Sequence, residues 1–223
     1  MNVKISFVFV AALFAVLLQN CAPARYVKPL EKNQQAASFS FGGPIIGFAG
    51  TSIPIPFTTL SYARGINDRL TGFAGLHVTS LAFGNFQTDI GANYGVWKTE
   101  RMGLSAAVAA QFATGLGKAN STRLWPSADI NYYIQPKGKN SYAYGGVGSW
   151  FELSSMRAHG VEQKQHVLPN LHLGYQFNAA KFCHQVEFKY LAPGINNLPG
   201  VVDYRGLSGK GAFGIYYGVT RKF

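Results

Sequence analysis

Apolar and polar residues alternate along most of this chain, while long stretches with the spacing of an amphipathic helix are missing. Counted back by twos from Phe223, one face of 213–223 is aromatic or branched and the other is small or polar. A period of two predicts a β-strand whose faces meet different solvents. The pattern recurs, cleanly or loosely, at 37–48, 57–66, 70–83, 86–98, 102–114, 123–135, 141–153, 165–177 and 181–191.

The length of these stretches favours membrane strands. They run to roughly 10–14 residues, whereas strands of globular proteins average about 5 or 6. A strand tilted by about 45° needs about 9–11 residues to cross the apolar layer of a bilayer. A transmembrane β-barrel is therefore favoured over the alternatives, a secreted sandwich or a lipocalin-like barrel.

The joins between the stretches alternate in length. Four are short and polar, namely "INDR", "KTER", "PKGKNS" and "NAA", whereas the joins at 49–56, 154–164 and 192–208 are long. Outer-membrane barrels have an even strand number, short periplasmic turns and longer outside loops. We predict an all-β fold over 37–223, an antiparallel up-and-down barrel of ten strands with both ends in the periplasm. Eight strands remain the alternative if the first two do not span.

Composition agrees with a membrane barrel and narrows the partners. Only 13% of the residues are charged and 14% are aromatic, and the formal net charge is +11. The basic residues are dispersed, which disfavours nucleic acid and favours outer-membrane lipids and lipopolysaccharide. Many of them fall near the predicted periplasmic turns: Arg64, Arg69, Lys98, Arg101, Lys137, Lys139, Lys181, Arg221 and Lys222.

Aromatic residues near strand ends or on outward faces suit the boundary between water and lipid. The residues that we expect in such interfacial girdles are Tyr62, Tyr94, Trp97, Trp125, Tyr132, Trp150, Tyr175 and Tyr190.

The first 20 residues read as a signal peptide. Lys4 precedes an apolar stretch at 5–18, which is shorter than the roughly 20 residues of a spanning helix. Residues 21–36 contain two prolines and little apolar periodicity, so we expect an extended periplasmic tether before the barrel.

Both ends of the chain resemble known bacterial signals. The last strand, with its alternate apolar residues and aromatic end, is similar to that of small bacterial outer-membrane barrels, where it implies a signal for barrel assembly. The residues that carry this signal are Phe213, Ile215, Tyr217, Val219 and Phe223. The segment "LLQNCAP" resembles a lipoprotein signal with the looser lipobox of Bacteroidota. That resemblance implies a covalent lipid, of the palmitate type, on Cys21, which anchors the chain in the periplasmic leaflet of the outer membrane.

Motifs of catalysis or metal binding are scarce, so we expect no enzyme, cofactor or metal site. His166 and His172 share one face of a strand but lie about 20 Å apart, too far for one metal ion. Charged and amide side chains on the inward faces must pair in a narrow lumen, because an unpaired buried charge is costly. We predict one lumen network of Asp89, Asn93, Gln111, Asp129, Asn131, Gln185, Glu187 and Lys189.

A barrel with a second, lipid anchor suggests assembly with a partner. We therefore expect a non-enzymatic accessory or structural subunit of a larger envelope complex. The alternatives are a narrow porin for small solutes and an enzyme that modifies lipid A.

Overall fold

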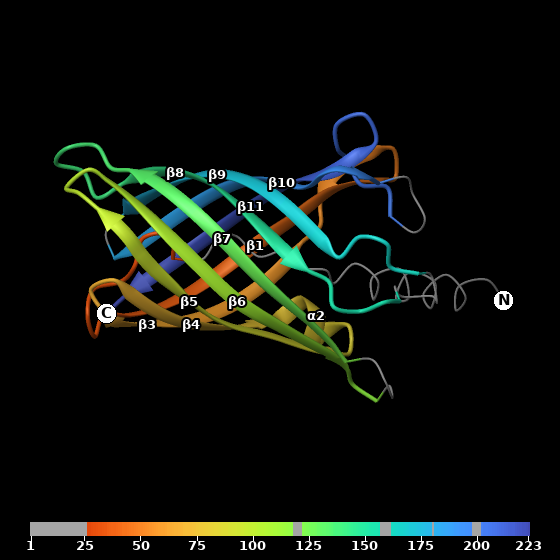
Figure 1. The fold of residues 1–223 in the computed structure, drawn as a ribbon, viewed down its shortest axis with the longest axis horizontal. Helices are drawn as coiled ribbons and strands as arrows, with labels where there is room; N and C mark the ends of the chain where they lie inside the picture. The colour runs from red at the N-terminus through yellow and green to blue at the C-terminus, as the bar shows by residue number, and fades with distance from the viewer. Residues whose placement is uncertain (1–25, 118–121, 157–161, 180, 198–201) are drawn as a thin grey trace.

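Ten antiparallel strands close into a barrel in the computed structural model, which describes residues 26–117, 122–156, 162–179, 181–197 and 202–223 (Figure 1). This confirms the predicted fold and its strand number. The wall consists, in order, of β1 (Gln35–Phe48), β3 (Phe57–Asn67), β4 (Leu70–His77), β5 (Asn85–Lys98), β6 (Met102–Gly115), β7 (Arg123–Ile134), β8 (Tyr142–Phe151), β9 (Val167–Ala179), β10 (Phe182–Asn196) and β11 (Lys210–Lys222).

The ring closes where β1 pairs with β11, with Ala36 opposite Lys222 and Pro44 opposite Gly214. Short turns after β3, β5, β7 and β9, together with the start of β1 and the end of β11, lie at one end of the barrel, called here the turn end. The longer connections lie at the loop end. There β2 (Thr51–Pro54) pairs with the last part of β1 and extends that hairpin beyond the ring.

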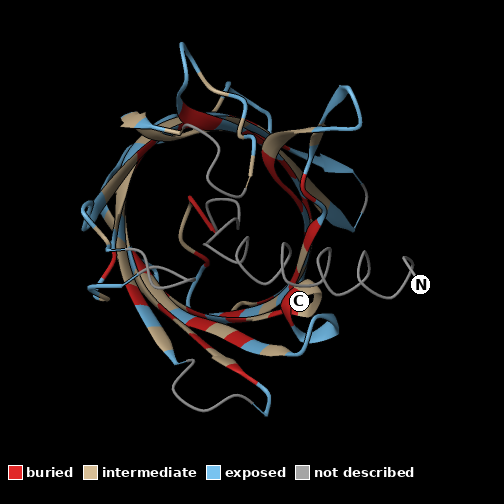
Figure 2. Cartoon of the chain, turned by 90° about the vertical axis from the view of Figure 1, so that its right-hand side faces the viewer, coloured by how far each residue is buried: buried red, intermediate tan, exposed pale blue. Residues whose placement is uncertain are grey.

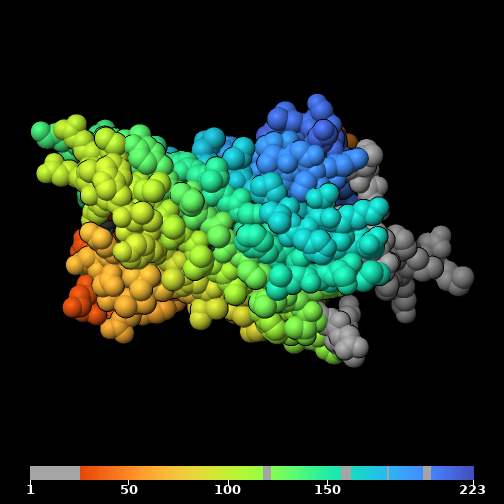
Figure 3. All heavy atoms as spheres, viewed as in Figure 1, coloured from red at the N-terminus to blue at the C-terminus, as the bar shows by residue number. Residues whose placement is uncertain are grey.

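The outer face of the wall is apolar, as the alternation predicted. Ile90 is 68% exposed and Leu173 is 62% exposed, while the residues beside them in the sequence point into the barrel. From the side, the side chains of the green to blue strands form a continuous outer surface (Figure 3). Because β1 pairs with β11, each described wall strand has a neighbour on both sides, so the wall satisfies its backbone hydrogen bonds internally, as a membrane requires.

The predicted third strand is shorter than expected, and this is a correction. Strand β4 ends at His77, and α2 (Val78–Ala82) follows where the sequence predicted strand up to residue 83. The hydroxyl of Thr79 accepts a hydrogen bond from the backbone N–H of Thr58 and donates to the carbonyl of Pro56. The helical turn is thus fixed by polar contacts to the neighbouring strand, which leave no trace in the apolar pattern. No helix of the described residues is long and apolar enough to cross a membrane.

Five of the eight predicted girdle residues are exposed on the outer face at the turn end. The exposed outer-face members there are Tyr62, Tyr94, Trp97, Tyr132 and Tyr175. Trp125 and Trp150 are exceptions, because both face inward. Trp125 is only 6% exposed and its Nε1 donates to Glu152 Oε2 at 2.7 Å. Trp150 lies on the same face of β8 as the buried residues Tyr142 and Tyr144. Trp125 lies on the same face of β7 as Ser127 and Asp129, so its direction follows the alternation and not its place near a strand end.

Candidate functional site

The lumen is occupied at the turn end by residues 26–34, a stretch called here the plug. Figure 2, which looks along the barrel, shows a short coloured piece of chain inside the ring of strands. Val27 and Leu30 are 2% and 1% exposed. The plug packs between two groups of lumen residues, one around Phe73 and the other around Tyr133. This corrects the prediction of an unpacked tether for residues 26–36; Cys21 and residues 1–20 lie outside the described residues.

Side chains of the wall hold the backbone of the plug through hydrogen bonds. Asn93 donates through Nδ2 to the carbonyls of Tyr26 and Val27, and Ser105 Oγ donates to the carbonyl of Val27 at 2.6 Å. The backbone N–H of Leu30 donates to Thr71 Oγ1 at 2.7 Å. The sequence placed Asn93 in the predicted lumen network, but it missed that its partner is the chain's own N-terminal stretch.

The base of the plug rests against β3 at a glycine. Gly65 exchanges backbone hydrogen bonds with the plug, accepting from Asn33 and donating to Gln34, both at 2.9 Å. A Cβ at Gly65 would collide with the carbonyl oxygen of Glu31. Only glycine allows the plug to lie this close to the wall.

Of the two lysines of the plug, Lys28 is half-buried in the mouth of the barrel, whereas Lys32 is exposed. Lys28 Nζ donates to Gln135 Oε1 at 2.9 Å. Burial lowers the pKa of Lys28 from its ordinary value, and the positive charges of Lys98 and Lys222 lower it further. The charge of Lys28 therefore opposes the docked plug, although Glu31 partly offsets it, while apolar contacts and hydrogen bonds favour docking.

Beyond the plug, β8, β9 and β10 hold the Glu187 cluster, made of Tyr144, Gln185, Glu187 and Lys189. The Tyr144 hydroxyl accepts from Gln185 Nε2 and donates to Glu187 Oε2 at 2.7 Å. Lys189 Nζ pairs with Glu187 Oε1 at 3.4 Å and also lies 5.7 Å from the centre of the Tyr216 ring. Glu187 is fully buried, so the ammonium group and the phenol replace its hydration.

Gaps above glycines allow these side chains to meet across a strand. Gly174 lies between Tyr144 and Glu187 in the pairing of β8, β9 and β10. A Cβ at Gly174 would collide with the ring of Tyr144 and come within 2.7 Å of the carbonyl oxygen of Val186. A glycine at an inward position of a strand thus makes room for a phenol from the next strand.

A second contact of the same kind joins β7 and β9. His172 Nε2 lies 2.6 Å from Asn131 Oδ1, and His172 Nδ1 lies 3.1 Å from Asn170 Oδ1. Gly146 stands between the two strands, and a Cβ there would come within 2.5 Å of His172 Nε2. Asp129 lies on the same face of β7, where a Cβ at Gly148 would touch its carboxylate.

On the other side of the lumen, β3 to β6 hold the His77 cluster, made of Thr59, His77, Asp89 and Gln111. His77 Nε2 lies 3.1 Å from Asp89 Oδ2 and 3.1 Å from Gln111 Nε2. Thr59 Oγ1 lies 3.4 Å from His77 Nδ1. A hydroxyl, an imidazole and a carboxylate therefore stand in a row, an order that the sequence pattern did not suggest.

The predicted network residues have partners in different parts of the lumen. Asp89 and Gln111 share one cluster, Gln185, Glu187 and Lys189 share another, and Asn93 faces the plug. The sequence missed His77 and Tyr144 as central members. The signal for both was their inward place in the alternation, which reveals the face of a residue but not its partner. Among the described residues, no group of His, Cys, Asp and Glu could hold a metal ion.

No protein-family model and no curated protein matches the sequence. Among solved structures, the chain is similar to an outer membrane channel from Pseudomonas putida F1, at 12% identity and a TM-score of 0.49, over 92% of this chain and 100% of that one. It is also similar to the toluene transporter TbuX of Ralstonia pickettii, at 10% identity and a TM-score of 0.40, over 94% and 97%. A third is the outer membrane protein OprG of Pseudomonas aeruginosa, at 10% identity and a TM-score of 0.34, over 87% and 98%. At these identities the likeness concerns the fold alone and says nothing about a solute.

Proposed function

We propose that the protein is a narrow outer-membrane channel for small polar solutes, which its own plug holds closed. The observation that carries this proposal is the plug itself, buried at one mouth of a lumen that is lined with hydrogen-bonding side chains. The wall is closed without the plug, so a barrel that served only as a rigid core would not need one.

The membrane orientation follows from the connections. In outer-membrane barrels the short turns and both chain ends face the periplasm, and the long loops face outside. The turn end of this barrel carries the start of β1, the end of β11 and the plug. We place the plug at the periplasmic mouth on this basis.

The plug is built so that it can leave without opening the wall. It precedes β1 in the chain, and the ladders of β1 to β3 and β11 are complete without it. Its deeper residues are held by a few side-chain hydrogen bonds, each with a net contribution of about 1 kcal/mol. The pair of backbone bonds at Gly65 attaches the base of the plug to the wall.

Conductance in planar bilayers tests the proposal. The wild-type chain should be mostly closed, while Gly65→Ala, which pushes the base of the plug from the wall, should raise the open probability at least tenfold. Gly72→Ala is the matched control on the neighbouring strand, because a Cβ there meets only the Ile66 side chain, at an ordinary 3.5 Å.

A disulfide lock supplies the opposite test. In a Cys183→Ser background, Leu30→Cys with Thr71→Cys should bind the plug to β4, since the Leu30 N–H already contacts the Thr71 hydroxyl. Conductance should disappear on oxidation and return with dithiothreitol. A plug-free variant that folds but never conducts would refute the channel.

That negative result would favour the accessory-subunit function expected from the sequence. One observation points the same way: the cavity left between the plug, β1 and β11 is only about 30 Å³. Such a volume holds about two water molecules and no solute. Co-purification of a partner at native expression, together with a silent plug-free barrel, would establish this second function.

The lipid on Cys21 belongs to the same proposal. Cys21 lies five residues before Tyr26, so it is at most about 18 Å from the docked plug. An acyl group in the periplasmic leaflet would pull on the plug through this short stretch. Mass spectrometry of the mature N-terminus tests the lipid, and an unmodified residue other than Cys21 would refute it.

A further inference from the structure

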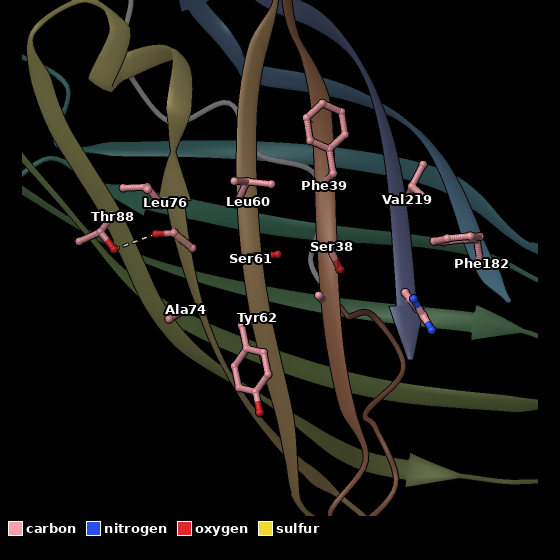
Figure 4. A pocket seen from close by; sticks show the side chains of 13 residues that line it. Ser38, Phe39, Leu60, Ser61, Tyr62, Ala74, Leu76, Thr88, Phe182 and Val219 are labelled. Atoms are coloured by element: carbon pink, nitrogen blue, oxygen red, sulfur yellow. Dashed lines mark hydrogen bonds between the residues drawn. The ribbon is translucent and has the colours of Figure 1, made fainter. Parts of the chain in front are cut away.

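The outer wall carries an apolar groove over β1, β3, β4 and β11, with a volume of about 670 Å³ (Figure 4). Ligand pockets in proteins measure about 300–1,000 Å³. The groove is deep at Ala37 and Ala74, because these small side chains flank Tyr62 on the two neighbouring strands. Farther from the turn end, Phe39 and Leu60 stand side by side as its apolar border.

The depth of the groove selects one leaflet. Ala37 is the third residue of β1 and Phe39 the fifth, counted from the turn end. At a strand tilt of about 40°, each residue advances about 2.5 Å along the barrel axis. The groove therefore lies within about 5–10 Å of the periplasmic mouth, inside the inner half of a roughly 30 Å apolar layer. Lipopolysaccharide, which belongs to the other leaflet, does not reach it.

A basic residue stands at the end of the groove nearest the mouth. Arg221 lines it, lies opposite Ala37 across the β1–β11 seam, and is exposed. None of the ion pairs among the described residues includes Arg221. At this depth the guanidinium group meets the headgroup layer, where phosphate is the matching anion.

We infer that this groove is a binding site for one glycerophospholipid of the inner leaflet. Its acyl chains fill the hollow over Ala37 and Ala74, and Arg221 binds its phosphate. The inference uses the membrane orientation of the proposed channel but does not depend on whether the lumen conducts. The plug enters the lumen and not this outer face, so an acyl group on Cys21 is a less suitable occupant than a free lipid.

Native mass spectrometry of the full chain, purified in a mild detergent and titrated with dioleoylphosphatidylglycerol, tests the site. We expect one tightly retained lipid per barrel. Arg221→Gln should weaken its binding about tenfold, because one charge-assisted contact is lost. Arg101→Gln, which removes a charge from a turn at the same end, should have no such effect.

Substitutions that fill the groove test the lipid site independently of Arg221. Ala37→Leu with Ala74→Leu should abolish retention, whereas Ala128→Leu on β7, across the barrel, should leave it unchanged. The heat-dependent shift in gel mobility confirms that each variant has folded. Equal losses in the control and groove variants would overturn the site, since they would indicate ordinary annular lipid. Tighter binding of lipid A, or a groove covered by a second copy in a dimer, would overturn it as well.

Discussion

The Glu187 cluster and the plug are both polar structures inside the same lumen, but they are held in opposite ways. Glu187 receives the Tyr144 hydroxyl and the Lys189 ammonium group, and all three side chains belong to strands of the wall. The plug is held through its backbone by Asn93, Ser105 and Thr71, and it belongs to no strand. The wall cannot release Glu187 without unfolding, whereas the strand pairings that close the ring do not include the plug.

Substitutions in the two regions should therefore change different measured properties. Damage to the Glu187 cluster should appear as lost stability, because a buried charge loses its partner. Damage to the contacts of the plug should appear as altered conductance with unchanged stability.

Glu187→Ala should destabilise the barrel by about 3–5 kcal/mol, because it leaves the Lys189 ammonium group in the lumen without its carboxylate. Urea unfolding in micelles measures this loss. Adding Lys189→Met to the variant should restore a large part of the stability. If the single variant were as stable as the wild type, the cluster would not hold the wall.

Gly174→Ala should cost about 1–3 kcal/mol, since the new methyl group displaces the Tyr144 ring from its place above β9. The same unfolding experiment applies. Gly145→Ala serves as the control, because a Cβ there lies 3.5 Å from the carbonyl oxygen of His172, an ordinary contact. Equal effects of the two substitutions would contradict the role of the gap above Gly174.

Asn93→Ala combined with Ser105→Ala should weaken plug docking by about 1–2 kcal/mol, which is roughly a tenfold rise in open probability. Bilayer recordings measure it, and the urea midpoint should stay close to that of the wild type. A large loss of stability without altered gating would place the plug in the same class as the Glu187 cluster.

In the proposed channel, raising the pH should lower the open probability slightly. Below the lowered pKa of Lys28 the side chain is charged in both states, and burial together with Lys98 and Lys222 penalises the docked one. As the pH rises from that pKa toward the ordinary value of about 10.4, the docked state loses its proton and the penalty disappears. Open probability should fall a few-fold in this window and remain flat in Lys28→Met.

Prediction from sequence succeeded for properties that depend only on whether a side chain points into the barrel or out of it. Alternation located all ten wall strands of the described chain, apart from the end of β4, and it assigned Asp89, Glu187 and Lys189 to the inward faces. It failed for partners, because contact between Tyr144 and Glu187 depends on the register of three strands and on a glycine between them. The prediction for Trp125 was wrong because it rested on the position near a strand end, whereas the alternation along β7 places this residue on the inward face.

The alternation of apolar and polar residues was enough to predict the barrel and the solvents of its two faces, because a period of two is a local property of each strand. The choice of ten strands over eight, and the segment that fills the mouth of the barrel, emerged with the tertiary structure. Residues 26–34 have too few apolar residues to predict burial, yet Val27 and Leu30 are enclosed because the wall supplies the surrounding apolar surface and the hydrogen-bond partners. Burial of an aperiodic segment depends on the cavity that receives it, and that cavity exists only once distant strands have closed into a ring.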